Sequence, residues 1–370
     1  MNEPFKNQLS AEKARWIGTA LKRAYPAFPA ARFSKGLDAA LEPHELKQRM
    51  LLIAGRIESC LPDDPQTMFP ILTAALATHP EDRTGLRGFL VWPLTEVVAR
   101  RGLGHFKPSM TALREMTRCF TSEFAIRPFL RTHRNRTLKQ LHAWCDDPDE
   151  HVRRLVSEGS RPLLPWGGNL MELLQEPHPT LELLERLYQD PSDYVRLSVS
   201  NHLNDFSKHH PRLVIGTLTR WREKAGSDPR LHRLSRHACR TLLKAGDPGA
   251  LELHGFGSSK SLDLTEFFLN ESRVKLGGSL GYRIVIRNSS KTPVKVMFDY
   301  AIHHLKANGT LSPKVFKGRV RELAPGETWR IDGRHPIRPI TTRVYYPGTH
   351  AFEPLINGRG FPPKQFELAV

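Results

Sequence analysis

One short run of the sequence combines charged side chains with an aromatic ring at spacings that could stabilise a cation. It reads Arg153-Arg154-Leu-Val-Ser-Glu158-Gly-Ser-Arg161-Pro-Leu-Leu-Pro-Trp166-Gly. On a helix, Arg154, Glu158 and Arg161 stand at i, i+4 and i+7 and share one face. The prolines that follow must end this helix, and they would hold Trp166 on a stiff loop. Asp205 occupies the matching face of a later helical segment.

The charge of the chain makes these carboxylates unusual. The 370 residues include 55 Lys and Arg against 38 Asp and Glu, a net charge of +17, and this excess favours a polyanion, first of all a nucleic acid. A carboxylate in such a surface repels DNA unless it has a chemical task. Cleavage of an N-glycosidic bond leaves an oxocarbenium-like sugar, as glycoside hydrolysis does. Acidic groups in a basic groove therefore hint at glycosidic chemistry.

The same residues also have plain structural interpretations. Arg154 and Glu158 could form an ordinary exposed helix ion pair, which stabilises by only about 0.3–0.5 kcal/mol. Trp166 could close the end of a helical repeat, because tryptophan often anchors cores and interfaces.

An internal repeat indicates which elements position these residues. The run that begins Asp147-Pro148 returns 43 residues later as Asp190-Pro191, and a weaker copy starts at Asp228-Pro229. A period of about 40–47 residues is typical of HEAT-type repeats. In each copy we expect the Asp to cap the second helix and the Pro to be its first residue. The pattern predicts an α-solenoid over residues 1–255, whose second helices line the concave side.

After residue 255 the pattern changes to alternation typical of strands, at 282–287, 294–300 and 341–346. Turn signals at Asn308-Gly309, Pro325-Gly326, Asp332-Gly333 and Pro347-Gly348 favour a small antiparallel sandwich. We therefore expect a linker at 256–262 and an immunoglobulin-like β-sandwich at 263–370. Residues 256–370 carry 18 basic and 9 acidic side chains, so the sandwich should contribute to binding a polyanion.

Set in these repeats and followed by a β-rich domain, the run from Arg153 to Gly167 resembles the AlkC branch of the AlkC/AlkD alkylpurine DNA glycosylases. The resemblance covers essentially the whole chain. It implies a monofunctional glycosylase that excises cationic alkylated bases, chiefly 3-methyladenine and 3-methylcytosine, from duplex DNA without a deep base pocket. It also implies that the helical repeats hold the duplex and that the immunoglobulin-like domain helps to encircle and bend it.

The resemblance also implies roles for individual residues. Glu158 and Trp166 match the motif directly, with Trp166 packing against the sugar of the lesion. Glu158 and Glu123 would stabilise the sugar cation or place the attacking water, and Asp205 is the third candidate. Arg154 would orient a carboxylate or hold a phosphate. A 3-methylated base already carries a positive charge, so it leaves without a general acid, and no lysine stands out as a Schiff-base nucleophile.

Further basic residues are candidate DNA contacts. Besides Arg154 and Arg161, they are two residues of a predicted strand, Arg319 and Arg321, and three residues of a predicted Pro-rich basic loop, Arg334, Arg338 and Arg343. Such contacts would position the duplex without reading its sequence. The alternative is ordinary surface charge.

Other chemistries find little support. There is no phosphate-binding loop, no H-E-x-x-H and no G-x-S-x-G, and the four cysteines lie far apart. We expect no metal and no small-molecule cofactor, no membrane span or secretion signal, and a cytoplasmic monomer that joins the nucleoid when bound. Two alternatives stay open: a non-catalytic HEAT-repeat DNA-binding scaffold, and a HEAT adaptor for acidic proteins, which the salt dependence of duplex affinity would separate.

Overall fold

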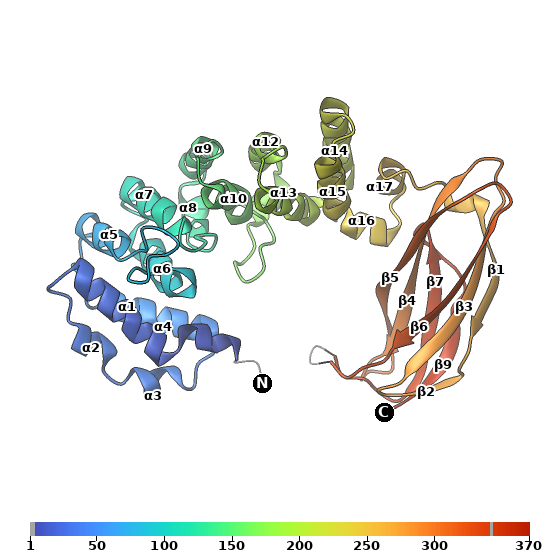
Figure 1. Cartoon of the computed structure of the whole chain (residues 1–370), viewed down its shortest axis with the longest axis horizontal. Helices are drawn as coiled ribbons and strands as arrows, with labels where there is room; N and C mark the ends of the chain where they lie inside the picture. Colours follow the sequence, from blue (N-terminus) through green and yellow to red (C-terminus); the bar gives the residue numbers. More distant parts are fainter. Residues whose placement is uncertain (1–3, 341–342) are drawn as a thin grey trace. The chain divides into compact units, whose positions relative to one another are not determined.

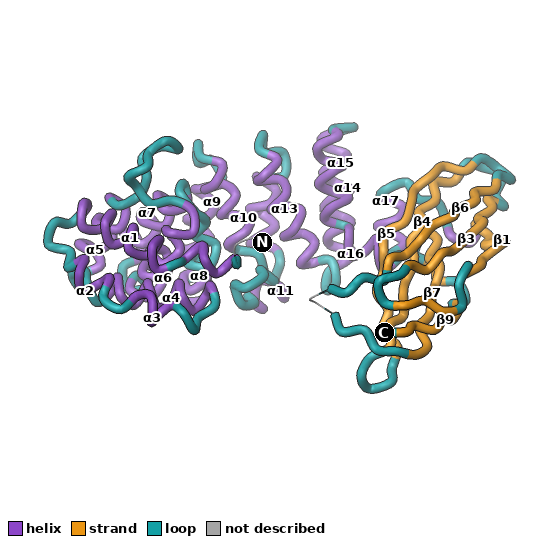
Figure 2. The backbone as a smooth tube through the Cα atoms, turned by 60° about the horizontal axis from the view of Figure 1, so that its bottom comes forward, coloured by secondary structure: helices purple, strands orange, loops and turns teal. Residues whose placement is uncertain are grey.

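The computed structural model describes residues 4–340 and 343–370. The chain divides into two compact units, Met1–His209 and His210–Val370, and each is described by itself. The first unit is helical, and the second begins with helices and continues as a β-sandwich (Figure 1 and Figure 2). The predicted order, helices first and a β-sandwich after them, is confirmed. The predicted boundaries at 255 and 263 stay a prediction.

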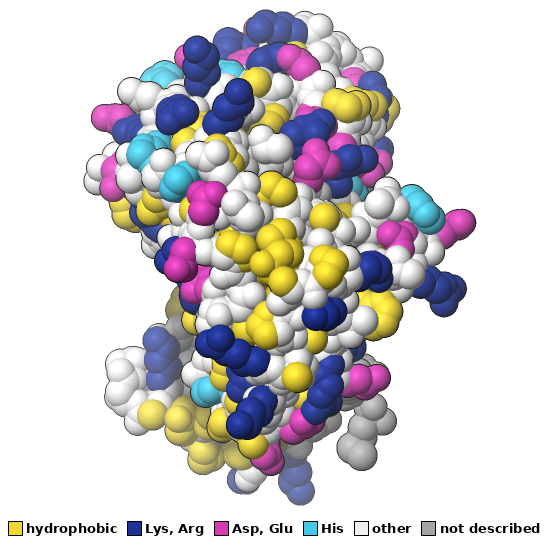
Figure 3. Space-filling view, turned by 90° about the vertical axis from the view of Figure 1, so that its left-hand side faces the viewer, with side chains coloured by type: hydrophobic (Ala, Val, Ile, Leu, Met, Phe, Trp, Pro, Cys, Tyr) yellow, Lys and Arg dark blue, Asp and Glu magenta, His cyan; other side chains and the backbone are white. Residues whose placement is uncertain are grey.

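The first unit is built from short helices joined by tight turns. They are η1 (Phe5–Leu9), α1 (Ala11–Ala24), α2 (Ala30–Ser34), α3 (Leu37–Leu41), α4 (Leu46–Glu58), α5 (Pro65–Ala74), η2 (Gly88–Val91), α6 (Trp92–Arg101), α7 (Phe106–Thr117), α8 (Arg127–Thr132), α9 (Arg134–Trp144), α10 (Glu150–Gly159), α11 (Met171–Gln175), α12 (His178–Leu187) and α13 (Asp193–Phe206). Helix α10 packs against α9, α12 and α13. On the face shown in Figure 3, hydrophobic side chains gather at the centre, and acidic and basic side chains are interspersed around them.

The repeated Asp-Pro pairs do not start helices in the predicted way in the first two copies. Helix α10 begins at Glu150 with Asp149 as its N-cap, and α13 begins at Asp193 after Ser192. The prediction is wrong there because the Asp147 and Asp190 carboxylates accept hydrogen bonds from arginines. The prediction is confirmed in the third copy. There the Asp228 side chain accepts the backbone N–H of Arg230 at the start of α15, and Pro229 is the first helical residue.

These aspartates join successive repeats. Arg114 of α7 donates to Asp147 at 2.6 Å, and Arg153 of α10 donates to both oxygens of Asp190 at 2.7 and 3.0 Å. Paired hydrogen bonds from one guanidinium fix orientation as well as distance. The two aspartates thus link neighbouring repeats.

The second unit holds the remaining elements. They are α14 (Pro211–Ala225), α15 (Pro229–Ala238), α16 (Arg240–Ala245), α17 (Pro248–Leu253), η3 (Ser259–Ser261), β1 (Leu262–Leu269), β2 (Arg273–Lys275), β3 (Ser279–Asn288), β4 (Val294–Leu305), β5 (Leu311–Leu323), β6 (Thr328–Pro336), β7 (Gly348–Ile356), β8 (Arg359–Gly360) and β9 (Lys364–Ala369).

The strands form two sheets around one hydrophobic core. One sheet has the order β1-β3-β6, and the other has the order β2-β9-β7-β4-β5, with β8 paired to β7. Inward-facing side chains such as Ile284, Phe298, Ile331 and Phe352 fill the space between the sheets. Strand β5 is an edge strand, and most of its side chains are exposed.

Two predictions for the sandwich are wrong. Asp332-Gly333 is not a turn but lies inside β6, where Gly333 pairs with Tyr282. A Cβ at Gly333 would lie 2.3 Å from the Tyr282 ring, so this glycine makes room for an aromatic side chain. Of the strand predicted at 341–346, residues 341 and 342 lie outside the described residues, and residues 343–346 form only an isolated bridge at Arg343.

Candidate functional site

The three predicted carboxylates lie in one chain of ion pairs within the first unit. Glu123 precedes α8, Glu158 ends α10 and Asp205 lies near the end of α13. Arg154 joins Glu123 to Glu158, with N···O distances of 2.5 and 3.5 Å, and Arg161 joins Glu158 to Asp205 at 2.6 and 2.9 Å. The repeat spacing thus brings together side chains that are up to 82 positions apart in sequence.

Arg161 is the centre of this chain and is buried, with a side chain only 8% exposed. Its Nε and Nη2 donate to the two oxygens of Asp205, and its Nη1 donates to Glu158. Burial acts to lower the pKa of Arg161, but the carboxylates of Asp205 and Glu158 outweigh it, so the pKa is raised. Removing one partner of such a buried pair costs about 3–5 kcal/mol, so the arrangement is rigid.

Arg154 is fixed by three neighbours. Its Nη1 donates to Glu123 Oε2 and, at 3.1 Å, to Thr121 Oγ1, which itself donates to Glu123 Oε2 at 2.9 Å. The ring of Tyr194 faces the guanidinium at 5.1 Å. The Arg154–Glu158 pair is therefore not the exposed surface pair of the structural interpretation, since both side chains are largely buried.

The three carboxylates differ in how many of their oxygens accept hydrogen bonds. Glu158 Oε2 accepts from Ser198 Oγ at 2.7 Å, and Asp205 Oδ2 also accepts from the backbone N–H of Leu163 at 3.3 Å. Glu123 accepts through Oε2, and within residues 4–340 and 343–370 no hydrogen bond reaches its Oε1. Glu123 therefore has an acceptor to offer a ligand or water.

Trp166 lies on the loop between α10 and α11, and its side chain is 64% exposed. Its φ of 65° places a bulky residue in the left-handed region, a strain of about 1–3 kcal/mol that persists only where the surroundings enforce it. Such strain is common at functional sites. The ring does not fill the core of a repeat, so the structural interpretation as a plug does not describe it.

Arg127 of α8 fixes the loop that carries Trp166 through hydrogen bonds to its backbone. Its fully buried guanidinium donates to four backbone carbonyls, those of Gly159 at 3.1 Å, Arg161 at 2.7 Å, Gly167 at 3.0 Å and Gly168. Burial is the main reason that its pKa falls to about 10. Because Arg127 follows Glu123 on the same segment, it ties Glu123 to the loop of Trp166.

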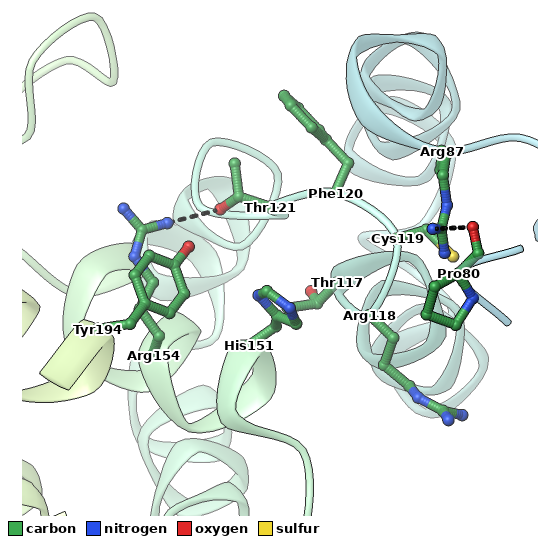
Figure 4. A pocket seen from close by; sticks show the side chains of 10 residues that line it. All are labelled: Pro80, Arg87, Thr117, Arg118, Cys119, Phe120, Thr121, His151, Arg154 and Tyr194. Atoms are coloured by element: carbon green, nitrogen blue, oxygen red, sulfur yellow. Dashed lines mark hydrogen bonds between the residues drawn. The ribbon is translucent and has the colours of Figure 1, made fainter. Parts of the chain in front are cut away.

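A hollow of about 420 Å³ lies beside Arg154 (Figure 4). In Figure 4 the Arg154 and Tyr194 side chains lie together at one end, and Arg87 and Arg118 lie across the hollow. The hollow is open to solvent and not enclosed.

The predicted DNA contacts differ in their surroundings. The side chain of Arg161 is engaged by Glu158 and Asp205. Arg319 and Arg321 are exposed on β5, and Arg321 pairs with Glu327 at 2.6 Å. The basic loop is shorter than predicted because Arg334 belongs to β6.

Two further predicted contacts follow that strand. Arg338 is exposed, and Arg343 faces the ring of Tyr345.

Several residues of this region were missed by sequence reasoning. Tyr194 and Ser198 could have been found, because they fall on the helix that the repeat aligns with α10. Arg127 could not, because its four acceptors come from the end of α10 and the loop after it, more than 30 residues away.

Within the residues that the structure describes, no group of three or more His, Cys, Asp or Glu side chains could hold a metal. In the same part of the chain, no helix combines the length and apolar character needed to cross a membrane.

Known proteins match this chain in sequence and in structure. Residues 113–242 match the family described as DNA alkylation repair enzyme, and residues 263–370 match the C-terminal Ig-like domain of the YhaZ family. YhaZ of Bacillus subtilis (strain 168) is 38% identical over 91% of this chain and 92% of its own. The alkylpurine DNA glycosylase AlkC of Pseudomonas fluorescens, bound to DNA containing an abasic-site analog, is 35% identical over the whole of both chains, with a TM-score of 0.90.

Proposed function

Since the chain belongs to the family of AlkC-type alkylpurine DNA glycosylases, we propose that it hydrolyses the N-glycosidic bond of cationic alkylated bases, chiefly 3-methyladenine and 3-methylcytosine, in duplex DNA. The observation that carries this proposal is the chain of ion pairs from Glu123 to Asp205. It concentrates three carboxylates in a protein of net charge +17, and the exposed ring of Trp166 stands on the loop that follows α10.

The carboxylates act on the sugar as the base departs. The leaving base takes the bonding electrons and becomes neutral, and positive charge develops on the deoxyribose. Fixed carboxylates stabilise this charge without reorganising during the reaction. The negative charges of Glu158 and Asp205 stabilise the positive sugar. Glu123 uses its Oε1 to accept a hydrogen bond from the attacking water.

Trp166 packs its ring against the sugar of the lesion. Its exposed ring and its fixed, strained backbone support this role. The duplex lies in the groove of the helical repeats, and the immunoglobulin-like domain helps to encircle and bend it. The lesion is reached from the sugar side, without a deep base pocket.

DNA contacts come from the basic side chains outside the ion-pair chain. Arg319, Arg321, Arg334, Arg338 and Arg343 are the proposed phosphate contacts of the sandwich. The protein acts as a cytoplasmic monomer that joins the nucleoid, and it leaves the strand intact, as expected from a sequence in which no lysine stands out as a Schiff-base nucleophile.

The proposal is tested by incubating the protein with methylated duplex DNA and measuring the free bases. We expect release of 3-methyladenine and 3-methylcytosine, an intact strand until the abasic sites are cleaved by alkali, and much slower release by Glu158→Gln. A protein that binds duplex but releases no alkylated base would instead be the non-catalytic scaffold.

A further inference from the structure

The second unit contains a cluster of cations of its own. A hollow of about 100 Å³ is lined by Arg236 of α15, by Arg240 and Lys244 of α16, and by Lys317 and Arg319 of β5. Figure 1 and Figure 2 both show α16 beside β5. Helical and strand elements thus contribute basic side chains to one place.

Among the described residues, most of these cations form no ion pair, although the buried carboxylate of Asp299 lies near three of them. In the part of the chain that the structure describes, no carboxylate forms an ion pair with Arg236, Lys244, Lys317 or Arg319. Many other arginines of the protein are paired, such as Arg153 with Asp190. Like charges held close together repel, and that repulsion is relieved when an anion binds between them.

The one acidic residue that lines the hollow is used inside the fold. Asp299 of β4 is buried and accepts the N–H of Gly318 at 2.9 Å, in the bulge that interrupts the pairing of β4 and β5. Burial raises the pKa of Asp299, while Lys317, Lys244 and Arg236 act in the opposite direction. Three cations, Lys317 of β5, Lys244 of α16 and Arg236 of α15, therefore lie around the buried Asp299 carboxylate.

The bulge itself requires glycine. A Cβ at Gly318 would lie 2.2 Å from the carbonyl oxygen of Phe298. This close approach lets the backbone of β5 carry Lys317 and Arg319 on either side of the bulge. Bulges commonly re-aim side chains at sheet edges.

We propose that this hollow is a phosphate-binding site that holds one or two backbone phosphates of the bound duplex at the edge of the sandwich. The inference rests on the proposed function, because it takes the polyanion to be the DNA substrate. It adds Arg236, Lys244 and Lys317 to the contacts expected from the sequence, and it assigns Arg319 to a site shared with the helices.

The test is the salt dependence of affinity for an undamaged duplex. Each phosphate contact that is lost lowers the slope of log K against log [salt] by about 0.9. We expect Lys244→Gln/Lys317→Gln to lower this slope by about 1–2. A matched control replaces Lys260 and Lys291, which are exposed elsewhere in the unit, by Gln. Thermal unfolding confirms that each variant is folded, and Arg236→Gln gives a second, independent reading.

The outcomes separate the inference from the proposed function. A slope equal to that of the control variant overturns the inference. The inference is also overturned by a second result. If calorimetry shows that the wild type binds inorganic phosphate, but the variant keeps the wild-type salt slope for duplex DNA, the hollow binds a free anion and not a DNA phosphate. If the slope falls but the wild type releases no alkylated base, the phosphate site stands and the proposed glycosylase activity fails.

Discussion

Arg161 and Asp205 meet through two parallel hydrogen bonds, Nε to Oδ2 at 3.0 Å and Nη2 to Oδ1 at 2.9 Å. The same guanidinium holds Glu158 through its remaining nitrogen at 2.6 Å. One side chain therefore fixes the two carboxylates of α10 and α13 relative to each other. The catalytic proposal depends on this rigidity, because preorganised charges stabilise a cation better than mobile ones.

Replacing Arg161 by Lys should keep the charge but lose the geometry. A lysine cannot bond Asp205 in parallel and also reach Glu158, so we expect base release to slow about 10- to 100-fold. Single-turnover kinetics measure this. The control is Arg153→Lys, which breaks a similar pair with Asp190 between repeats. If Arg161 is instead a phosphate contact, Arg161→Gln will lower the salt slope by about 0.9.

Trp166→Gly should separate function from folding. Glycine adopts a φ of 65° without strain, so we expect the free energy of unfolding to rise by about 1 kcal/mol while base release slows. Denaturant unfolding and single-turnover release are measured on the same preparation. Trp166→Ala should also slow release, with little effect on affinity for undamaged DNA. A glycine variant less stable than the wild type would make the ring a structural element.

Arg127→Met should loosen the loop of Trp166. It leaves four carbonyls without their donor, two of them in buried hydrogen bonds and two in partly buried ones, so the free energy of unfolding should fall by about 3 kcal/mol or more. The control is Arg131→Met on the same helix, because Arg131 is exposed and makes one bond of 3.3 Å to Asn169. Equal effects of the two substitutions would contradict the holding role of Arg127.

Acid should destabilise the protein through its buried histidines. Burial, with Arg161 and Arg127 nearby, lowers the pKa of His202 to about 3. Between pH 6.5 and 3 the unfolded chain therefore binds more protons, and stability falls as the pH falls. We expect His202→Leu to reduce this slope by up to about 1.4 kcal/mol per pH unit. Denaturant unfolding at a series of pH values measures it, and His209→Leu, at an exposed position, should leave the slope unchanged.

The sequence predicted what depends on periodicity. The repeat of 43 residues placed Glu158 and Asp205 on matching faces, and the structure brings them together with Glu123. Composition and alternation also predicted the change from helices to strands.

What the sequence could not show depends on tertiary contacts. Asp147 looked like a helix cap, but its carboxylate bonds Arg114 of the preceding repeat. Gly333 looked like a turn residue, but it makes room for Tyr282. Arg127 had no recognisable partner, because carbonyls leave no signature in a sequence.

The most direct test of the account is the rate of 3-methyladenine release by Glu123→Gln. The substitution keeps the size of the side chain and removes the charge of the carboxylate that has an unbonded oxygen. We expect single-turnover release at saturating enzyme to fall about 100-fold or more, with unchanged affinity for an abasic duplex. Glu172→Gln, at an exposed position, should behave as the wild type. Wild-type release by Glu123→Gln would contradict the account.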